Sequence, residues 1–226
     1  MNHLVETKPD SGLARLVVTL GVALLLGGCA VLPERDGEPQ QWRLVASDPV
    51  VEVADISEPV IVRLIETRAA SAIDRRDMAY SRGRQSLAYY RDNRWASPPG
   101  MMLNEIIDET LSTQPWVRTV IRGGARVPSD LSLYCELQRL EHQLGPRGAG
   151  QKQGEVQMKV ACSWYQAAER QLVEAMIFDE TIELETNDAE HYAAGAQALV
   201  DQLMTRLAAQ GAPLAATTAS LPVEND

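Results

Sequence analysis

Two stretches of alternating residues constrain the fold of this chain more than any other feature. Apolar side chains occupy every second position in both: Leu131, Leu133, Cys135 and Leu137 in the first, and Val156, Met158, Val160, Cys162 and Trp164 in the second. A period of two is typical of β-strands that bury one face. A glycine-rich stretch from Gly145 to Gly150 lies between them. The pattern therefore predicts two antiparallel strands joined by a loop.

The two cysteines predict the register of this pair. When Cys135 lies opposite Cys162, Leu133 lies opposite Trp164 and both apolar sets share one face. A shift of one residue would place the two sets on opposite faces. We therefore predict a disulfide between Cys135 and Cys162. Two free, buried thiols are the alternative.

Disulfides persist in oxidising compartments, and the N-terminal segment predicts export. A weakly basic start is followed by an apolar run from Leu16 to Leu26, eleven residues long. A membrane-spanning helix needs about 20 apolar residues, so this run is typical of a secretory signal instead. Gly27-Gly28-Cys29 then resembles a bacterial lipobox, whose cysteine receives a diacylglyceryl group before cleavage. An ordinary signal peptide that happens to contain a cysteine is the alternative.

This interpretation divides the chain into four parts. We expect a lipoprotein signal peptide at 1–28, a flexible tether at 29–40, one domain at 41–211 and a disordered tail at 212–226. No cofactor is expected apart from covalent N-acyl diacylglycerol on Cys29, with acyl chains such as palmitate. In the lipoproteins that this pattern resembles, aspartate after the cysteine favours the inner membrane. Ala30 therefore indicates lipid anchoring at the periplasmic face of the outer membrane.

The charge of the chain excludes some partners. The formal net charge is -10 at pH 7, so nucleic-acid phosphates and anionic lipid surfaces would repel the protein as a whole. Membrane attachment is therefore expected to come from the lipid on Cys29, because acyl chains bind a bilayer through their buried methylenes.

The rest of the sequence predicts an α/β (α+β) fold. We expect strands at 41–45, 60–64, 116–121 and 172–184, and a hairpin of 77–81 with 86–91 around Gly83. One helix is predicted from Pro98 to Thr113, and another from a cap at Asn187 or Asp188 to a stop at Gly211. Their buried faces are Leu103, Ile106, Ile107 and Leu111 in the first, and Tyr192, Ala196, Leu199, Leu203 and Leu207 in the second. The prediction is one domain with two principal helices and a mixed, mostly antiparallel sheet.

The sequence offers little support for catalysis. His142 and His191 are the histidines outside the predicted signal peptide, and both are expected on the solvated surface. We find no nucleophile elbow, phosphate-binding loop or zinc signature. We therefore predict a protein that is not an enzyme and holds no metal. An envelope hydrolase that uses paired carboxylates is the remaining catalytic alternative.

Arginine and aromatic residues are concentrated between Asp74 and Trp95. Both kinds are enriched at protein interfaces, because they bury much area at low entropic cost. The predicted partner-binding residues are Arg75, Arg76, Tyr80, Arg82, Tyr89, Tyr90, Arg94 and Trp95. The alternative is structural: the hairpin folds back onto Glu105, Asp108 and Glu109 of the following helix.

This segment resembles one known family. Ile73-Asp74-Arg75-Arg76, Tyr80-Ser81-Arg82, Leu87-Ala88-Tyr89-Tyr90 and Arg94-Trp95-Ala96-Ser97-Pro98-Pro99 are similar to the pattern of the ABC-type transport auxiliary lipoproteins. The similarity extends to Trp42-Arg43-Leu44 and Trp116-Val117-Arg118-Thr119-Val120, so it covers most of the chain from Trp42 to Leu207. An acidic stretch at 48–58 and the cysteines at 135 and 162 depart from that pattern.

The resemblance implies a function. Members of this family resemble outer-membrane lipoproteins that face the periplasm and work with an MCE-domain protein, an ABC permease and an ATPase. Such systems move lipids between the inner and outer membranes, and some auxiliary components form rings, which implies a homo-oligomer. The chain would then be a non-catalytic docking component. The alternative is a structural lipoprotein that assembles or stabilises an outer-membrane machine without handling lipid.

Overall fold

The computed structural model describes residues 37–47, 58–83, 85–123, 127–145, 154–168 and 170–219. The chain divides into two units, Met1–Glu38 and Pro39–Asp226, and every described helix and strand lies in the second. The predicted signal peptide, the lipidation site Cys29 and most of the tether lie outside the described residues.

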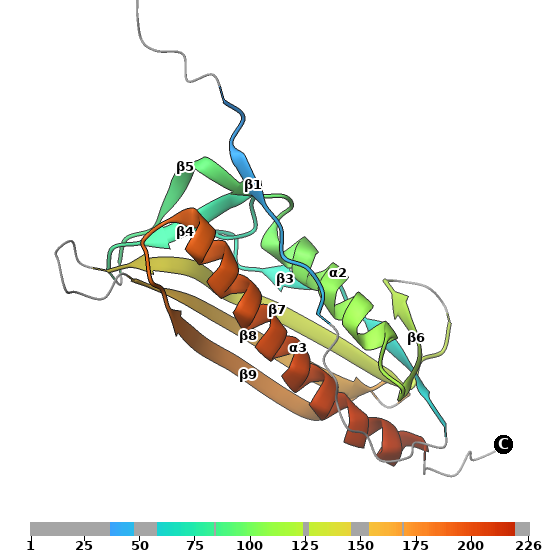
Figure 1. The fold of residues 1–226 in the computed structure, drawn as a ribbon. Helices are drawn as coiled ribbons and strands as arrows, with labels where there is room; N and C mark the ends of the chain where they lie inside the picture. Colours follow the sequence, from blue (N-terminus) through green and yellow to red (C-terminus); the bar gives the residue numbers. More distant parts are fainter. Residues whose placement is uncertain are drawn as a thin grey trace, which may run out of the picture. The chain divides into compact units, whose positions relative to one another are not determined.

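Strand β7 (Leu131–Leu144) is the centre of a nine-stranded mixed sheet (Figure 1). Along one edge it pairs antiparallel with β8 (Gly154–Gln166), which pairs antiparallel with β9 (Gln171–Glu183). Along its other edge, three short strands pair in parallel with successive parts of β7: β2 (Val60–Leu64), β3 (Arg68–Ala69) and β4 (Asp77–Ser81).

Three further strands extend the sheet beyond these. β6 (Val117–Arg122) runs parallel to β2, β5 (Ala88–Trp95) runs antiparallel to β4, and β1 (Gln40–Trp42) runs parallel to β5. β1 is shorter than the strand predicted at 41–45. With two helices and a mixed sheet in its described part, the structure confirms the predicted α+β single domain.

The register of β7 and β8 is confirmed. Cys135 lies opposite Cys162 and Leu133 lies opposite Trp164. The structure contains a disulfide between the two cysteines, with an S–S length of 2.05 Å and Cα atoms 4.1 Å apart. Both cysteines are buried, as the period-two pattern requires of residues on the core face.

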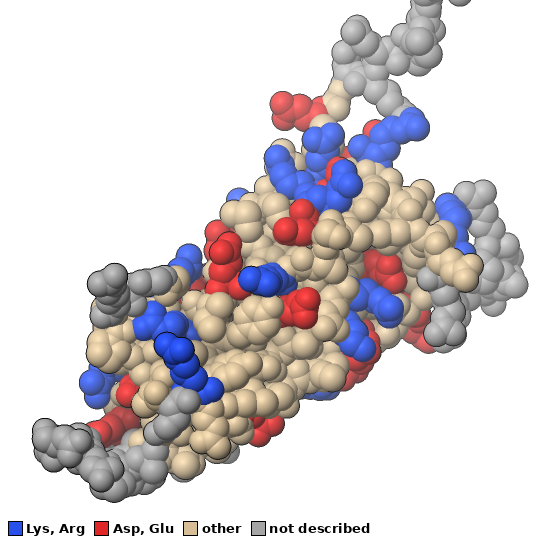
Figure 2. All heavy atoms as spheres, turned by 180° about the vertical axis from the view of Figure 1, so that it is seen from behind, with Lys and Arg blue, Asp and Glu red and all other residues tan. Residues whose placement is uncertain are grey.

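Helices α2 (Pro99–Ser112) and α3 (Ala189–Ala219) cover one face of the sheet (Figure 1). The residues predicted for their apolar faces are all buried. Pro99 begins α2, where its missing N–H costs nothing. The carboxylate of Asp188 caps α3 by accepting a hydrogen bond of 2.8 Å from the backbone N–H of His191. Figure 2 shows the opposite side, on which neither α2 nor α3 lies and where charged residues are scattered among other side chains.

The predicted end of the last helix is wrong. α3 continues through Gly211 and Pro213 to Ala219. The prediction of a disordered tail that starts at residue 212 is therefore wrong for residues 212–219. Residues 220–226 lie outside the described part. A Cβ at Gly211 would collide with the ring of Trp116. This glycine therefore allows the helix to pack closely against Trp116. The ring of Trp116 packs edge-on against that of Trp164, with the two ring centroids 6.2 Å apart.

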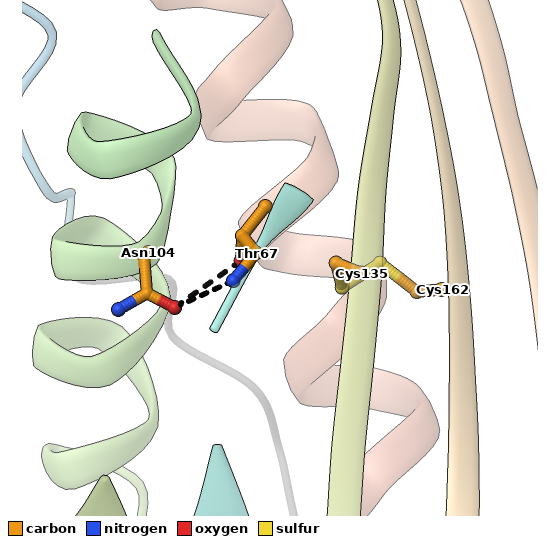
Figure 3. The surroundings of a disulfide bond; sticks show 4 residues. All are labelled: Thr67, Asn104, Cys135 and Cys162. Carbon is orange, nitrogen blue, oxygen red and sulfur yellow. Dashed lines mark hydrogen bonds between the residues drawn. A yellow bond between two sulfur atoms is a disulfide. The ribbon is translucent and has the colours of Figure 1, made fainter. Parts of the chain in front are cut away.

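Helix α2 is also tied to the segment before β3, close to the disulfide (Figure 3). The side-chain oxygen of Asn104 accepts hydrogen bonds from the backbone N–H of Thr67 at 3.0 Å and from its hydroxyl at 3.3 Å. Thr67 is buried, so these bonds satisfy polar groups that have lost contact with water. The helix is thereby fixed above the edge of the sheet where the parallel strands meet β7.

Candidate functional site: the arginine and tyrosine hairpin

The residues predicted to bind a partner lie on or beside the hairpin of β4 and β5. Antiparallel pairing of these strands confirms the predicted hairpin, and Gly83 takes a φ of 132° in its turn, which favours glycine. The ladder is irregular, however. Asp77 lies opposite Arg94 and Ala79 lies opposite Tyr89. Between these two pairs β4 advances by two residues and β5 by five, so β5 contains three extra residues. Such a bulge redirects side chains away from the regular face of a sheet.

On the outer side of the hairpin, the side chain of Arg75 contacts those of Tyr89 and Asp77. Its guanidinium carbon lies 4.4 Å from the centroid of the Tyr89 ring, and its Nη2 lies 2.6 Å from the Asp77 carboxylate. The hydrogen bond to Asp77 raises the pKa of Arg75, so this side chain keeps its charge. The Tyr89 hydroxyl donates to the carbonyl of Ala72 at 2.9 Å. Arginine and tyrosine thus form a fixed, solvent-exposed surface.

Arg76, the residue before β4, links β5 and β1 at the end of the hairpin. Its Nε donates to the carbonyl of Trp95 at 3.2 Å, and its Nη2 donates to Oε1 of Gln41 in β1 at 2.8 Å. Gln41 also lies beside Arg94 in the pairing of β1 with β5, and Arg94 is exposed. Figure 2 shows Lys and Arg side chains gathered at the end of the sheet that carries β1 and β5.

The inner side of the hairpin is aromatic and packs against α3. Trp95 is 1% exposed and meets the ring of Tyr192 edge-on at 5.4 Å. The prediction that Trp95 binds a partner is therefore wrong, because the core already surrounds its indole. Tyr90 packs edge-on against Tyr80 at 5.2 Å, and the guanidinium carbon of Arg82 lies 5.8 Å from the Tyr80 ring centroid.

A buried histidine lies beneath this aromatic layer. Nδ1 of His142 is 2.7 Å from the Tyr90 hydroxyl, and its ring lies 5.5 Å from the ring of Tyr192. Burial lowers the pKa of His142 to about 4 and raises the pKa of Tyr90 to about 12, so both are neutral at pH 7. The solvated position predicted for His142 is wrong. His142 follows Leu140 on the core face, beyond a shift in register between Leu137 and Arg139.

The alternative role of the hairpin, as a partner of the acidic face of α2, is not observed among the described residues. Asp108 of α2 instead accepts a hydrogen bond from Nε of Arg122 in β6 at 2.6 Å. The printed contacts of Arg75, Arg76 and Arg82 are instead with the hairpin itself and with β1.

The second histidine lies outside the hairpin, at the start of α3. Nδ1 of His191 is 2.9 Å from Asp188, and the hydrogen bond to this carboxylate raises the pKa of His191. Burial alone would raise the pKa of Asp188, but hydrogen bonds from His191 and Thr186 lower it to about 2. Among the described residues, no group of three His, Cys, Asp or Glu side chains could hold a metal ion. The ion pair lies at the start of α3, where the Asp188 carboxylate also caps the helix.

A comparison with protein-family models matches residues 30–208 to the ABC-type transport auxiliary lipoprotein component. The chain belongs to this family. The match contains the whole hairpin and begins at the residue after Cys29. A comparison with curated proteins found no match.

Solved structures share the fold of this auxiliary lipoprotein. A crystal structure of protein XCC0632 from Xanthomonas campestris, of family DUF330, is 17% identical with a TM-score of 0.66, covering 81% of this chain and 99% of that chain. Another, of an uncharacterized protein, is 12% identical with a TM-score of 0.58, covering 77% and 99%. At these identities the likeness shows the fold alone. None of the described helices of the auxiliary lipoprotein combines the length and apolarity needed to cross a membrane.

Proposed function

We propose that this chain is a lipid-anchored, non-catalytic docking component of an MCE-type ABC system that moves lipid between the inner and outer membranes. The family match over residues 30–208 carries the proposal, because the family consists of auxiliary lipoproteins of ABC-type transport systems. In this proposal Cys29 bears the acyl groups, the protein faces the periplasm from the outer membrane, and several copies assemble together.

The hairpin supplies the docking surface in this proposal. Arg75 and Arg76 are exposed but held in place by Asp77, Tyr89 and Gln41, so little side-chain entropy remains to be lost on binding. Arg94 is exposed at the same end of β4, opposite Asp77, and Arg82 is exposed at the turn beyond the other end of β4. Tyr80 and Tyr90 support this surface from the inner side. The expected partner surface is acidic, since complementary charge increases association and fixes orientation.

Purification of the acylated protein from envelopes through a C-terminal tag tests the proposal. We expect an MCE-domain protein to be recovered with the wild type and about tenfold less of it with Arg94→Glu, because charge reversal opposes an acidic partner. Arg118→Glu is the matched control, since Arg118 is also exposed but lies on β6, away from the hairpin.

Each other outcome contradicts part of the proposal. Equal recovery with Arg94→Glu would remove the hairpin from the interface. Recovery of an unrelated outer-membrane machine in place of an MCE-domain protein would instead favour the structural lipoprotein.

A further inference from the structure

The docking hairpin of β4 and β5 joins β7 at one short place. β4 pairs with β7 at Tyr80 and Ser81, which lie beside His142 and Gln143. The pairing of β7 with β8 instead extends over the whole length of β7, and a disulfide supports it. A short pairing opens at a lower cost in free energy than a long one. The attachment of the hairpin therefore depends strongly on the side chains around Tyr80 and Ser81.

His142 connects β7 with both the hairpin and α3. Its backbone lies beside that of Tyr80 in β4, and its Nδ1 lies 2.7 Å from the hydroxyl of Tyr90 in β5. The centroid of the Tyr192 ring in α3 lies 5.5 Å from that of the His142 ring and 6.4 Å from that of the Tyr90 ring. One residue thus contacts three elements that are far apart in the sequence.

The surroundings of the His142 ring suit a neutral imidazole. The side chain is buried, and the Tyr90 hydroxyl shares one hydrogen bond with Nδ1. Nε2 forms no hydrogen bond of normal geometry with any described residue. An imidazolium carries an N–H on both nitrogens, so protonation would leave a charged donor buried without a well-placed acceptor. Such a group costs free energy that exposure to water would recover.

The charges near His142 reduce this cost only in part. Asp188, at the start of α3, raises the pKa of His142 through its negative charge, and the side chain of Asn187 raises it as well. Burial has the larger effect and lowers this pKa to about 4. The other neighbours are hydroxyl or hydrocarbon side chains: Tyr80 on β4, Tyr90 on β5, Val156 on β8 and Tyr192 on α3.

Two further charges act on the tyrosines around the ring. Arg82 lowers the pKa of Tyr90, but burial raises it to about 12. Glu141 and burial both raise the pKa of Tyr192. Both hydroxyls therefore keep their protons in acid, and His142 is the member of this cluster that changes its charge there.

The other end of the hairpin has its own attachment. Trp95 is buried against Tyr192, and β5 pairs with β1 from Asn93 to Trp95. These contacts do not involve the His142 ring, so they persist when its contacts are lost. Opening would then affect the turn end of the hairpin, which we define as residues 80–83 and 85–90.

We propose that His142 is a proton-controlled latch for the docking hairpin. A neutral imidazole holds the turn end on β7 and α3, whereas an imidazolium releases it and leaves the ladder of β7, β8 and β9 folded. Tyr89 is next to Tyr90 in the chain, so release also displaces the ring over which Arg75 lies. The inference rests on the proposed function, because it describes how acid would weaken docking at that same surface.

Proton linkage gives the size of the effect. The pKa of His142 is about 4 when the hairpin is attached and about 6.5 for a histidine in water. The equilibrium constant for opening should therefore rise about twentyfold from pH 7 to pH 5. His191 has the opposite sign, because Asp188 raises its pKa and its contribution to stability is lost as pH rises.

Amide hydrogen exchange of the full acylated chain, purified in detergent, tests the latch at pH 7 and pH 5. Protection factors correct for the pH dependence of chemical exchange. We expect the turn end to be less protected than β8 at both pH values, and to lose about twentyfold of its protection in acid. Low concentrations of urea should hardly change its exchange, since local opening exposes little surface.

Two variants identify the group that binds the proton. His142→Asn should remove the acid-induced loss of protection, because an amide oxygen can accept a hydrogen bond from Tyr90 without titrating. His191→Asn is the matched control and should retain the loss. NMR titration of the wild-type imidazoles adds a test that needs no variant: loss of protection at the turn end should follow protonation of His142 and not of His191.

Three results would overturn the inference: equal protection at the turn end at both pH values, the same acid-induced loss in His142→Asn, or a turn end that matches β8 in protection and urea dependence. The last result would mean that the domain opens only as a whole. Exchange is measured without transport partners. Failure of the latch would therefore leave the recovery of an MCE-domain protein untouched, and failure of that recovery would leave the latch measurable.

Discussion

The ladder of β7, β8 and β9 and the hairpin of β4 and β5 are both antiparallel, yet they are held in register by different means. In the ladder, long strands alternate apolar and polar residues, and a disulfide joins the central pair. In the hairpin, three extra residues on β5 interrupt the pairing, and Trp95 and Tyr90 fix its position by packing against Tyr192. The ladder specifies its register locally, whereas the hairpin depends on α3.

The largest expected effect tests this dependence of the hairpin on the core. Trp95→Ala should lower the free energy of unfolding by about 3–5 kcal/mol, because it removes a large side chain from a packed interior. Arg94→Ala, at the exposed neighbouring position, should change the free energy by less than about 0.5 kcal/mol. Urea denaturation of both variants measures the difference. Similar values for the two would show that the hairpin is not docked on α3.

The next effect concerns the ladder. Replacing both Cys135 and Cys162 by Ala should cost about 3–4 kcal/mol, since the bridge joins residues separated by 27 positions. The register should nevertheless persist, because the apolar alternation specifies it without the bridge. Amide hydrogen exchange along β8 checks this point. Loss of protection at the residues that pair with β7 would show that the disulfide alone determines the register.

A further effect concerns His142, which lies on β7 of the ladder and contacts Tyr90 of the hairpin, and it should make stability depend on pH. The folded pKa of His142, about 4, lies below its unfolded value of about 6.5. Between these values the unfolded chain binds a proton that the folded chain excludes. The free energy of unfolding should therefore fall as pH decreases from about 6.5 to about 4, by up to about 1.4 kcal/mol per pH unit.

Two variants separate this contribution from others. His142→Gln should flatten the acid side of the stability profile, as followed by denaturation at a series of pH values. His191→Gln should leave that fall in place, because the carboxylate of Asp188 raises the pKa of His191, and its contribution is lost as pH rises instead. Asp188, with a pKa of about 2, titrates below this range. A slope unchanged by His142→Gln would exclude His142 as its source.

The same contrast explains what could be predicted from the sequence. Alternation and the cysteine pair were sufficient for the register of β7 and β8, because local pattern and covalent chemistry agree there. Beyond Leu137 the register shifts, and a strict period of two then places Leu140 and His142 on the wrong face. The apolar residue Leu140, three positions after Leu137, indicates this shift. His142 lies two positions beyond Leu140 and therefore on the same face.

The predictions for Trp95 and Gly211 are wrong because tertiary contacts determine the roles of both residues. Arginine-rich surroundings indicated an interface at Trp95, but its indole packs against Tyr192 in a helix distant in sequence. Gly211 resembles a helix stop, yet a neighbouring tryptophan ring requires a residue without Cβ there.

The parallel edge of β7 also has a consequence for the order in which the chain can fold. β2, β3 and β4 all precede β7 in the sequence, and each pairs with it in parallel. During synthesis from the N-terminus, these strands emerge before their common neighbour exists. Contacts between residues far apart in sequence also close slowly. The strands before β7 can pair only within two separate groups, β1–β5–β4 and β2–β6, and these groups become one sheet only after β7 has been made.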